Sequence, residues 1–298
     1  MSRRLLGGLL LLALVAGGCS DGAEGADGAN EGTTTAAPVT PADMVDPPGD
    51  PSDPCRTGAP ESLVPEVVRT LEHDPNAYTQ GLVVHDGRLF ESTGLEGRSS
   101  IRELDPASGR VLRSEPLDDD VFGEGLAVGD DGRLVQLTWT DGIAYERDAD
   151  TFEELGRFEY DGEGWGLTTL ADGRLVMSDG SDELVIRDPA TFEALDSITV
   201  QRQGDAADRL NELEFDGTHV WANRYQTDEV LRIDLDCGLV TGVLDVGDLT
   251  RAARDAATEG DPSPEVSNGI AHLPGTDRYL LTGKRWPTMY EVTLRPAR

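Results

Sequence analysis

Short apolar runs separated by turn residues recur along residues 66–298 at a nearly constant spacing. Each copy opens with a polar or aromatic residue, usually followed by glycine and then an apolar strand. The five openings are Gln80-Gly81-Leu82, Glu124-Gly125-Leu126, Trp165-Gly166-Leu167, Asn211-Glu212-Leu213 and Asn268-Gly269-Ile270. Their second positions lie 44, 41, 46 and 57 residues apart. A period of about forty residues with short strands is typical of β-propeller blades, so an all-β, five-bladed propeller is predicted.

Turn residues divide the copies into strands. In the first copy, Gly- and Pro-containing turns leave four strand-like runs: 80–85, 88–93, 100–105 and 110–117. The last copy has three runs, near 269–274, 278–283 and 288–294. We expect the upstream run 66–71 to pair into this last blade and close the ring, because an open edge strand exposes unpaired backbone groups.

The longest interval precedes the last copy and contains residues 249–259, which favour a helix. We interpret them as a short helical insertion between the fourth and fifth blades. A flexible loop is the alternative.

The chain begins with the pattern of a secretion signal over residues 1–18. Arg3 and Arg4 precede an apolar run, and small residues lead into Cys19. This pattern predicts a lipoprotein signal with lipid on the Cys19 thiol, and a protein anchored outside the cytoplasm to a bacterial cell membrane. Ordinary secretion, with Cys19 inside a discarded signal, is the alternative.

Residues 19–55 carry many small residues, acidic side chains and no basic ones before Cys55. Such a composition cannot bury a core, so a disordered, lipid-anchored acidic linker is predicted, with 56–298 as the folded domain. Cys55 and Cys237 then remain for one disulfide, which an extracytoplasmic chain permits. Two unpaired thiols are the alternative.

The formal net charge of −32 argues against nucleic acid as a partner, because phosphate binding needs a basic patch. The sequence has no Cys-x-x-Cys pair or Cys/His cluster that would predict a zinc site. We expect neither a metal nor a cofactor, and we expect a monomer.

The blade topology predicts where chemistry gathers, because the start of each first strand and the end of each second strand share one rim. The strand starts are Gln80, Glu124, Trp165, Asn211 and Asn268. The strand ends are Trp139, Asp179, Tyr225 and Lys284, and Tyr78 and Phe122 lie two residues before Gln80 and Glu124. A few converging polar groups among aromatic walls is how small-ligand sites are usually built.

Two of these residues are the strongest candidates for chemistry. Lys284 is the one lysine among 25 basic residues, and a compact ammonium is not interchangeable with a guanidinium in a tight site. A chance surface lysine is the alternative. Glu124 stands where other copies carry amides, and partial burial there would raise its pKa to a useful value. Glu163 and Asp179 are competing acids, although Glu163 could simply cap a turn.

Seven ordered blocks between residues 64 and 294 resemble glutaminyl-peptide cyclotransferases of the plant and bacterial type. The most informative are YTQGLVVHDGRLFESTGLEGRSSIRELD, FGEGLAV, YDGEGWGLTT and NGIAHLPGTDRYLLTGKRWP. The resemblance implies a five-bladed propeller that acts as an acyltransferase. It would convert the N-terminal glutamine of peptides or proteins to pyroglutamate and release ammonia, without a cofactor.

The resemblance also implies residue roles. It places the catalytic glutamate on Glu124 and pocket residues on Gln80, Trp139, Trp165, Asn211 and Lys284. Tyr78 stands where the family commonly has phenylalanine, and Tyr225 where it commonly has tryptophan. These replacements keep a ring and add a hydroxyl.

The mechanism expected from these residues gives both proton transfers to Glu124, while Gln80, Asn211 or Lys284 stabilises the oxyanion. The substrate would lie among the rings of Tyr78, Phe122, Trp139, Trp165 and Tyr225. Two other functions stay open: a metal-dependent propeller lactonase or hydrolase, and a non-enzymatic binding propeller on the cell surface. The lactonase alternative would use Glu124, Asp179, Asn211 and the Asn268-Gly269 pair as oxygen ligands.

Overall fold

The computed structural model describes residues 55, 58–129 and 131–298. The expected signal over residues 1–18, the Cys19 lipid site and the linker up to residue 54 lie outside the described residues. No helix in the described part of the chain is long and apolar enough to cross a bilayer.

The chain folds into β-strands with one short helix. Three separate four-stranded antiparallel sheets come first, and their strands pair in sequence order. They comprise β2 (Thr79–His85), β3 (Arg88–Thr93), β4 (Ser100–Leu104) and β5 (Val111–Pro116); β6 (Gly123–Val128), β7 (Leu134–Thr138), β8 (Ile143–Arg147) and β9 (Glu154–Glu159); and β10 (Leu167–Thr169), β11 (Leu175–Ser178), β12 (Glu183–Arg187) and β13 (Ala194–Thr199). The strands predicted for the first copy are confirmed to within one residue at each end.

The remaining strands form a ten-stranded sheet built from two further groups of four. Its main strands are β16 (Leu210–Phe215), β17 (Val220–Arg224), β18 (Glu229–Asp234), β19 (Leu239–Asp245), β1 (Glu61–Glu72), β22 (Thr288–Pro296), β21 (Arg278–Gly283) and β20 (Ser267–His272). The expected pairing of the upstream strand is confirmed, since β1 runs antiparallel to β22 from Leu63 to Glu72.

Two features of this sheet were not predicted. The first residues of β1, Glu61–Leu63, also pair in parallel with Gly242–Leu244 of β19 and so join the two groups into one sheet. A small hairpin of β14 (Gln201–Arg202) and β15 (Asp205–Ala206) lies between β13 and β16. The expected helical insertion is confirmed as α1 (Gly247–Ala256).

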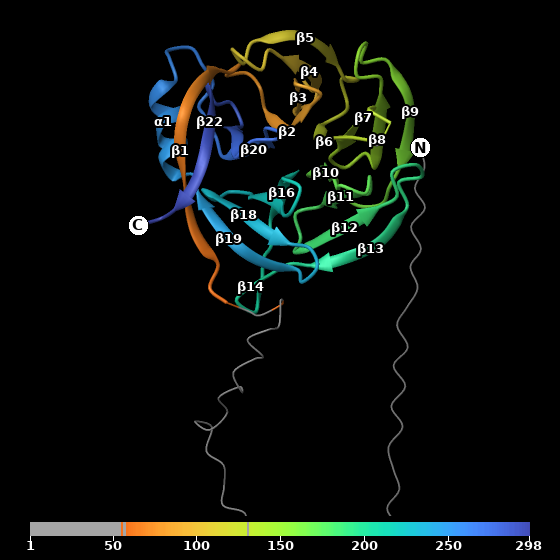
Figure 1. The fold of residues 1–298 in the computed structure, drawn as a ribbon. Helices are drawn as coiled ribbons and strands as arrows, with labels where there is room; N and C mark the ends of the chain where they lie inside the picture. The colour runs from red at the N-terminus through yellow and green to blue at the C-terminus, as the bar shows by residue number, and fades with distance from the viewer. Residues whose placement is uncertain (1–54, 56–57, 130) are drawn as a thin grey trace, which may run out of the picture. The chain divides into compact units, whose positions relative to one another are not determined.

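The sheets are arranged around a common centre, with β2, β6, β10, β16 and β20 innermost and β5, β9, β13, β19 and β1 outermost (Figure 1). The innermost strands contact one another in that order, and β20 also contacts β2. Hydrophobic clusters lie between neighbouring groups of four strands. One of them joins Leu82 and Leu89 of the first sheet to Ala271, Leu280 and Met289 of the last group.

The Cys55–Cys237 disulfide is present, with the two Cα atoms 5.2 Å apart. Cys237 lies in the turn between β18 and β19, close to the parallel pairing of β1 with β19. The disulfide therefore ties the beginning of the described chain to the sheet that β1 enters.

Candidate active site

All nine residues predicted to form a catalytic or binding site line one pocket of about 210 Å³. They come from every group of strands: Tyr78, Gln80, Phe122, Glu124, Trp139, Trp165, Asn211, Tyr225 and Lys284. The predicted rim position of these residues is thus where the pocket lies. Asn268 and Asp179, also placed at the rim by sequence, are not among the residues that line it.

The backbone directs the polar side chains into the pocket through irregularities in strand pairing. In four of the five innermost strands the register shifts at the pocket end, between Thr79 and Gly81, Gly123 and Leu126, Leu210 and Leu213, and Ser267 and Ile270. The residues inside these shifts include Gln80, Glu124, Asn211 and Asn268. A bulge of this kind re-aims a side chain out of the regular alternation of a strand.

The glycines that follow allow the innermost strands to approach closely. A Cβ atom on Gly81 would lie 2.5 Å from the Leu126 backbone nitrogen, and one on Gly125 would lie 2.6 Å from that of Leu167. Gly269 has a φ of +123°, which side-chain-bearing residues rarely adopt. The repeated polar-residue–glycine pair therefore places a side chain in the pocket and packs the next residue against a neighbouring strand.

The fourth copy carries Glu212 where the other copies carry glycine. The buried Glu212 carboxyl accepts hydrogen bonds from the backbone N–H groups of Leu82 (3.1 Å) and Ile270 (2.9 Å). Burial raises the pKa of Glu212 well above its usual range, against the opposing effect of the Ile270 N–H. Glu212 thus connects three innermost strands at the centre of the fold.

Glu124 is buried, and only one of its two carboxyl oxygens has a hydrogen-bond partner among the described residues. Its Oε1 atom accepts a hydrogen bond of 2.7 Å from Gln80 Nε2, and its Oε2 atom has no hydrogen-bond partner among the described residues. Burial raises the pKa of the Glu124 carboxyl well above its usual range, while the Lys284 ammonium opposes this rise and Glu163 adds to it. A raised pKa favours a carboxyl that takes up and releases a proton during catalysis.

Lys284 is buried rather than a chance surface lysine, with 1% of its surface exposed. Its Nζ atom donates a hydrogen bond to Gln80 Oε1 and lies 4.6 Å from the centre of the Tyr78 ring and 5.7 Å from that of Tyr225. Burial lowers the pKa of Lys284 to about 8, although Glu124 opposes the shift. Lys284 is therefore mostly charged at pH 7 and loses its proton in a mildly alkaline solution.

Gln80 is hydrogen-bonded to both Glu124 and Lys284. Its Nε2 donates to Glu124, and its Oε1 accepts from Lys284 and, at 3.1 Å, from Asn268 Nδ2. Asn211 differs, because its Oδ1 is buried without a hydrogen-bond partner among the described residues. The pocket thus contains two unsatisfied acceptors, Glu124 Oε2 and Asn211 Oδ1.

A second buried network supports Gln80 from behind. Asn268 Nδ2 also donates to the Thr79 backbone oxygen at 2.9 Å, and Thr79 Oγ1 donates to Glu91 at 2.7 Å. Glu91 pairs with His73 at 2.9 Å. Burial disfavours the imidazolium, but Glu91 outweighs it and the pKa of His73 is raised. This pair could not be predicted from the sequence, because His73 and Glu91 lie 18 positions apart with no motif to connect them.

The aromatic residues form two strings of edge-to-face contacts. The long aromatic string is Tyr78, Phe122 and Trp139, with ring centres 6.2 and 5.6 Å apart. The short aromatic string is Trp165 and Tyr225, with ring centres 5.5 Å apart. Lys284 lies over one ring of each string. The polar groups are therefore bordered by rings that can exclude water.

The competing acids have other partners. Glu163 accepts hydrogen bonds from two indole N–H groups, those of Trp139 (2.7 Å) and Trp165 (2.9 Å). The sequence suggested only that Glu163 could cap a turn, and these two indole contacts were not predicted. Asp179 is engaged in its own turn, where it accepts from the backbone and hydroxyl of Ser181 at 2.9 and 2.6 Å.

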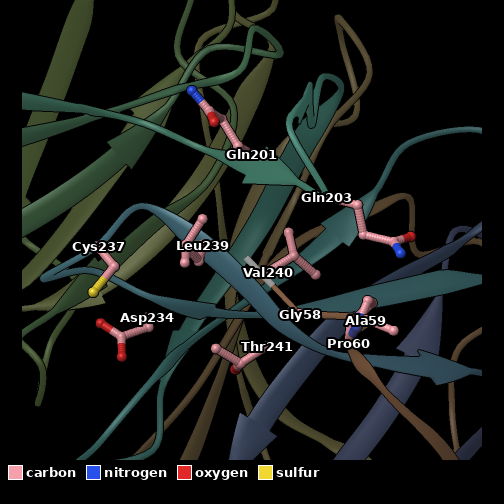
Figure 2. A pocket seen from close by; sticks show the side chains of 10 residues that line it. All are labelled: Gly58, Ala59, Pro60, Gln201, Gln203, Asp234, Cys237, Leu239, Val240 and Thr241. Atoms are coloured by element: carbon pink, nitrogen blue, oxygen red, sulfur yellow. The ribbon is translucent and has the colours of Figure 1, made fainter. Parts of the chain in front are cut away.

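Other places in the described chain offer less chemistry. No group of three or more His, Cys, Asp or Glu side chains there could hold a metal ion. Figure 2 shows a pocket of about 170 Å³ beside Cys237, where the 58–60 segment passes β14 and β19. Asp234 is the one charged side chain among its lining residues. Of these two pockets, only the one lined by Glu124 and Lys284 combines a buried carboxyl, a buried ammonium and unsatisfied acceptors.

Such a site is suited to proton transfer on a small polar substrate enclosed by aromatic rings. A profile of the family described as glutamine cyclotransferase matches residues 44–294. A glutaminyl-peptide cyclotransferase of Arabidopsis thaliana is 37% identical over 235 residues, covering 78% of this chain and 72% of the relative. The chain belongs to the glutamine cyclotransferase family.

A solved structure agrees with this assignment. The crystal structure of Myxococcus xanthus glutaminyl cyclase is 38% identical and superposes with a TM-score of 0.73. The match covers 80% of this chain and all of the Myxococcus chain.

Proposed function

We propose that the protein is a glutaminyl-peptide cyclotransferase, which converts the N-terminal glutamine of a peptide or protein to pyroglutamate and releases ammonia. Membership of the family supports the activity. The observation that carries the proposal is the pair of buried, unsatisfied acceptors on Glu124 and Asn211 beside a buried lysine. Buried acceptors without partners are costly, and an N-terminal glutamine brings amine and carboxamide N–H groups that would satisfy them.

The reaction forms a bond between the α-amine nitrogen and the side-chain carbonyl carbon of the same glutamine. We assign the proton transfers to Glu124, whose Oε2 is unpartnered and whose raised pKa suits both directions of transfer. It takes a proton from the attacking amine and gives one to the departing nitrogen as the carbon–nitrogen bond of the carboxamide breaks. General acid–base catalysis of this kind typically contributes ~10²–10⁴-fold to the rate.

Lys284 is the best placed of the three candidate donors to stabilise the oxyanion. An ammonium has three donors, and one of them already fixes its position through Gln80 Oε1. Removal of an oxyanion donor typically costs ~2.7–4 kcal/mol. Gln80 is hydrogen-bonded through both ends of its amide, which supports a positioning role between Glu124 and Lys284.

Asn211 and the aromatic strings would bind the substrate. Asn211 Oδ1 is free to accept from a substrate N–H group, and Tyr78, Phe122, Trp139, Trp165 and Tyr225 border the space where the glutamine side chain would fold back. Holding the amine against the carbonyl raises the rate, because the near-attack geometry is established before reaction.

A five-bladed propeller accounts for the arrangement of strands. Each blade would consist of one group of four strands, with β1 supplying the outermost strand of the last blade. The antiparallel pairing of β1 with β22 and the contact of β20 with β2 support a ring closed by this strand. In this reading the catalytic domain spans residues 56–298 and is a monomer.

We place the protein outside the cytoplasm, attached through lipid on Cys19 and joined to its domain by the acidic linker that ends at residue 55. The pattern of residues 1–19 supports the signal, and the Cys55–Cys237 disulfide supports an oxidising compartment. Labelled palmitate should enter the wild-type protein in bacterial cells and not the Cys19→Ala variant. Equal labelling of the two would contradict the anchor.

Ammonia release tests the activity itself. The full-length protein should release ammonia from a peptide that begins with glutamine and not from the same peptide with an acetylated N-terminus, since acetylation removes the nucleophile. A strong chelator should leave the rate unchanged. Release from the acetylated peptide, or no release from several glutamine-initiated peptides, would contradict the proposed function.

A further inference from the structure

Glu163 lies at the junction of the two aromatic strings. The long string ends at Trp139 and the short string begins at Trp165, and a single carboxylate oxygen, Glu163 Oε2, accepts a hydrogen bond from each indole. Lys284 contacts a ring at the other end of each string. Glu163 therefore connects the two strings through their indole N–H groups at this end.

The loop that carries Glu163 is fixed to Trp139. Gly164 donates a backbone hydrogen bond of 2.8 Å to the carbonyl oxygen of Trp139. A Cβ atom on Gly164 would lie 2.2 Å from the hydroxyl oxygen of Tyr160, so the loop is also packed closely beneath. The backbone next to Glu163 is thus held by contacts that do not involve the two indole N–H groups.

Trp139 depends on this contact more than the other rings do. Its side chain is 39% exposed, so packing alone constrains it weakly, whereas a hydrogen bond to a charged acceptor is stronger and more directional than a neutral one. Without the carboxylate, the Trp139 ring could turn away from Trp165 and widen the pocket.

We propose that Glu163 is a positioning residue that sets the separation of Trp139 and Trp165 and so determines how tightly the pocket holds the glutamine side chain. The proposal rests on the proposed function and adds a residue that acts on the substrate through the two indoles. It predicts an effect on substrate binding and little effect on the proton transfers.

Two substitutions at this position separate the contact from the charge. Glu163→Gln keeps an oxygen that can accept both indole N–H groups, whereas Glu163→Ala removes the acceptor. We expect Glu163→Ala to raise KM for a glutamine-initiated peptide about 10-fold, which corresponds to ~1.4 kcal/mol of binding free energy. The kcat should stay within about 3-fold of wild type. Glu163→Gln should keep KM within about 3-fold of wild type.

Asp161→Asn is the matched control, because it removes an exposed charge from the same loop and should leave both constants unchanged. Trp139→Phe provides an independent variant that keeps a ring and removes one N–H donor. It should raise KM by itself, and Glu163→Ala should then raise KM less in the Trp139→Phe background than in wild type.

A wild-type KM in Glu163→Ala, equal losses in Glu163→Gln and Glu163→Ala, or additive effects with Trp139→Phe would each overturn the proposal. Wild-type ammonia release is measured first. Its absence would contradict the proposed function, whereas active wild type with an unaffected Glu163→Ala variant would contradict only the role of Glu163.

Discussion

Replacement of Lys284 by methionine should stabilise the fold and remove most turnover. The pKa of Lys284 falls from 10.5 to about 8 on burial. At about 1.36 kcal/mol per pKa unit, holding this side chain charged in the folded protein costs about 3 kcal/mol at pH 7. Methionine has a similar length and no charge, and replacing a buried charge by an apolar group is often stabilising.

Two neighbouring residues respond to the loss of the ammonium: the response of Gln80 reduces the gain in stability, and that of Glu124 preserves it. Gln80 Oε1 loses one donor, at a cost of about 1 kcal/mol, but keeps its bond from Asn268. Glu124 loses the ammonium that opposes the rise of its pKa, so its pKa rises further and its neutral form is favoured. The net gain of about 2 kcal/mol corresponds to a rise in Tm of about 4–8 °C for a domain of this size.

The pH dependence provides a check on the cause. Between pH 8 and 10.5 the unfolded chain binds more protons at Lys284 than the folded protein does, so the free energy of unfolding of wild type rises with pH in this window. The advantage of Lys284→Met should therefore shrink by about 1 kcal/mol between pH 7 and pH 9. Thermal unfolding followed by circular dichroism measures both quantities, with Lys284→Arg as the control that retains a charge. A lower Tm in Lys284→Met than in wild type, or a difference independent of pH, would show that the buried charge of Lys284 does not destabilise the fold.

Three further predictions concern Glu124, the fall of kcat/KM at alkaline pH and the Cys55–Cys237 disulfide. Glu124→Gln should lower kcat ~10²–10⁴-fold without loss of fold, because it preserves shape and removes the proton acceptor; near-normal turnover would exclude Glu124 from this role. In wild type, kcat/KM should rise with pH as Glu124, whose pKa is raised, loses its proton, and should fall above about pH 8 as Lys284 loses its own. In Lys284→Arg the residual activity should lack this fall, since arginine stays charged; a fall at the same pH would assign the limb to another group. Cys237→Ser should lower the free energy of unfolding by up to about 5 kcal/mol in chemical denaturation, because the disulfide closes a loop with a sequence separation of 182, and should leave kcat unchanged. Equal stability of this variant and oxidised wild type would show that the disulfide contributes little.

Much of the strand order could be predicted, because alternating polar and apolar residues and turn glycines encode it locally. The same repeats placed Gln80, Glu124 and Asn211 at equivalent strand positions, which is why the pocket residues could be named without coordinates. The parallel pairing of Glu61–Leu63 with β19 could not be predicted, since three residues at a strand end carry no register signal toward a partner far away in sequence.

The contacts within the site depend on side-chain placement that sequence spacing does not specify. Glu163 was identifiable as an acid near Trp165, but its bond to Trp139 requires the loop to return to a neighbouring strand end. Gln80 was correctly placed, yet the engagement of both ends of its amide emerges only when Glu124 and Lys284 are brought to either side.

The cyclotransferase activity is tested most directly by the mass of the product that the full-length protein forms from a glutamine-initiated peptide. We expect a product lighter than the peptide by one ammonia and resistant to aminopeptidase, because cyclisation removes the free α-amine. An unchanged peptide would contradict the activity. A product in which water has replaced ammonia, leaving N-terminal glutamate, would show hydrolysis and contradict the water-excluding role given to the aromatic strings.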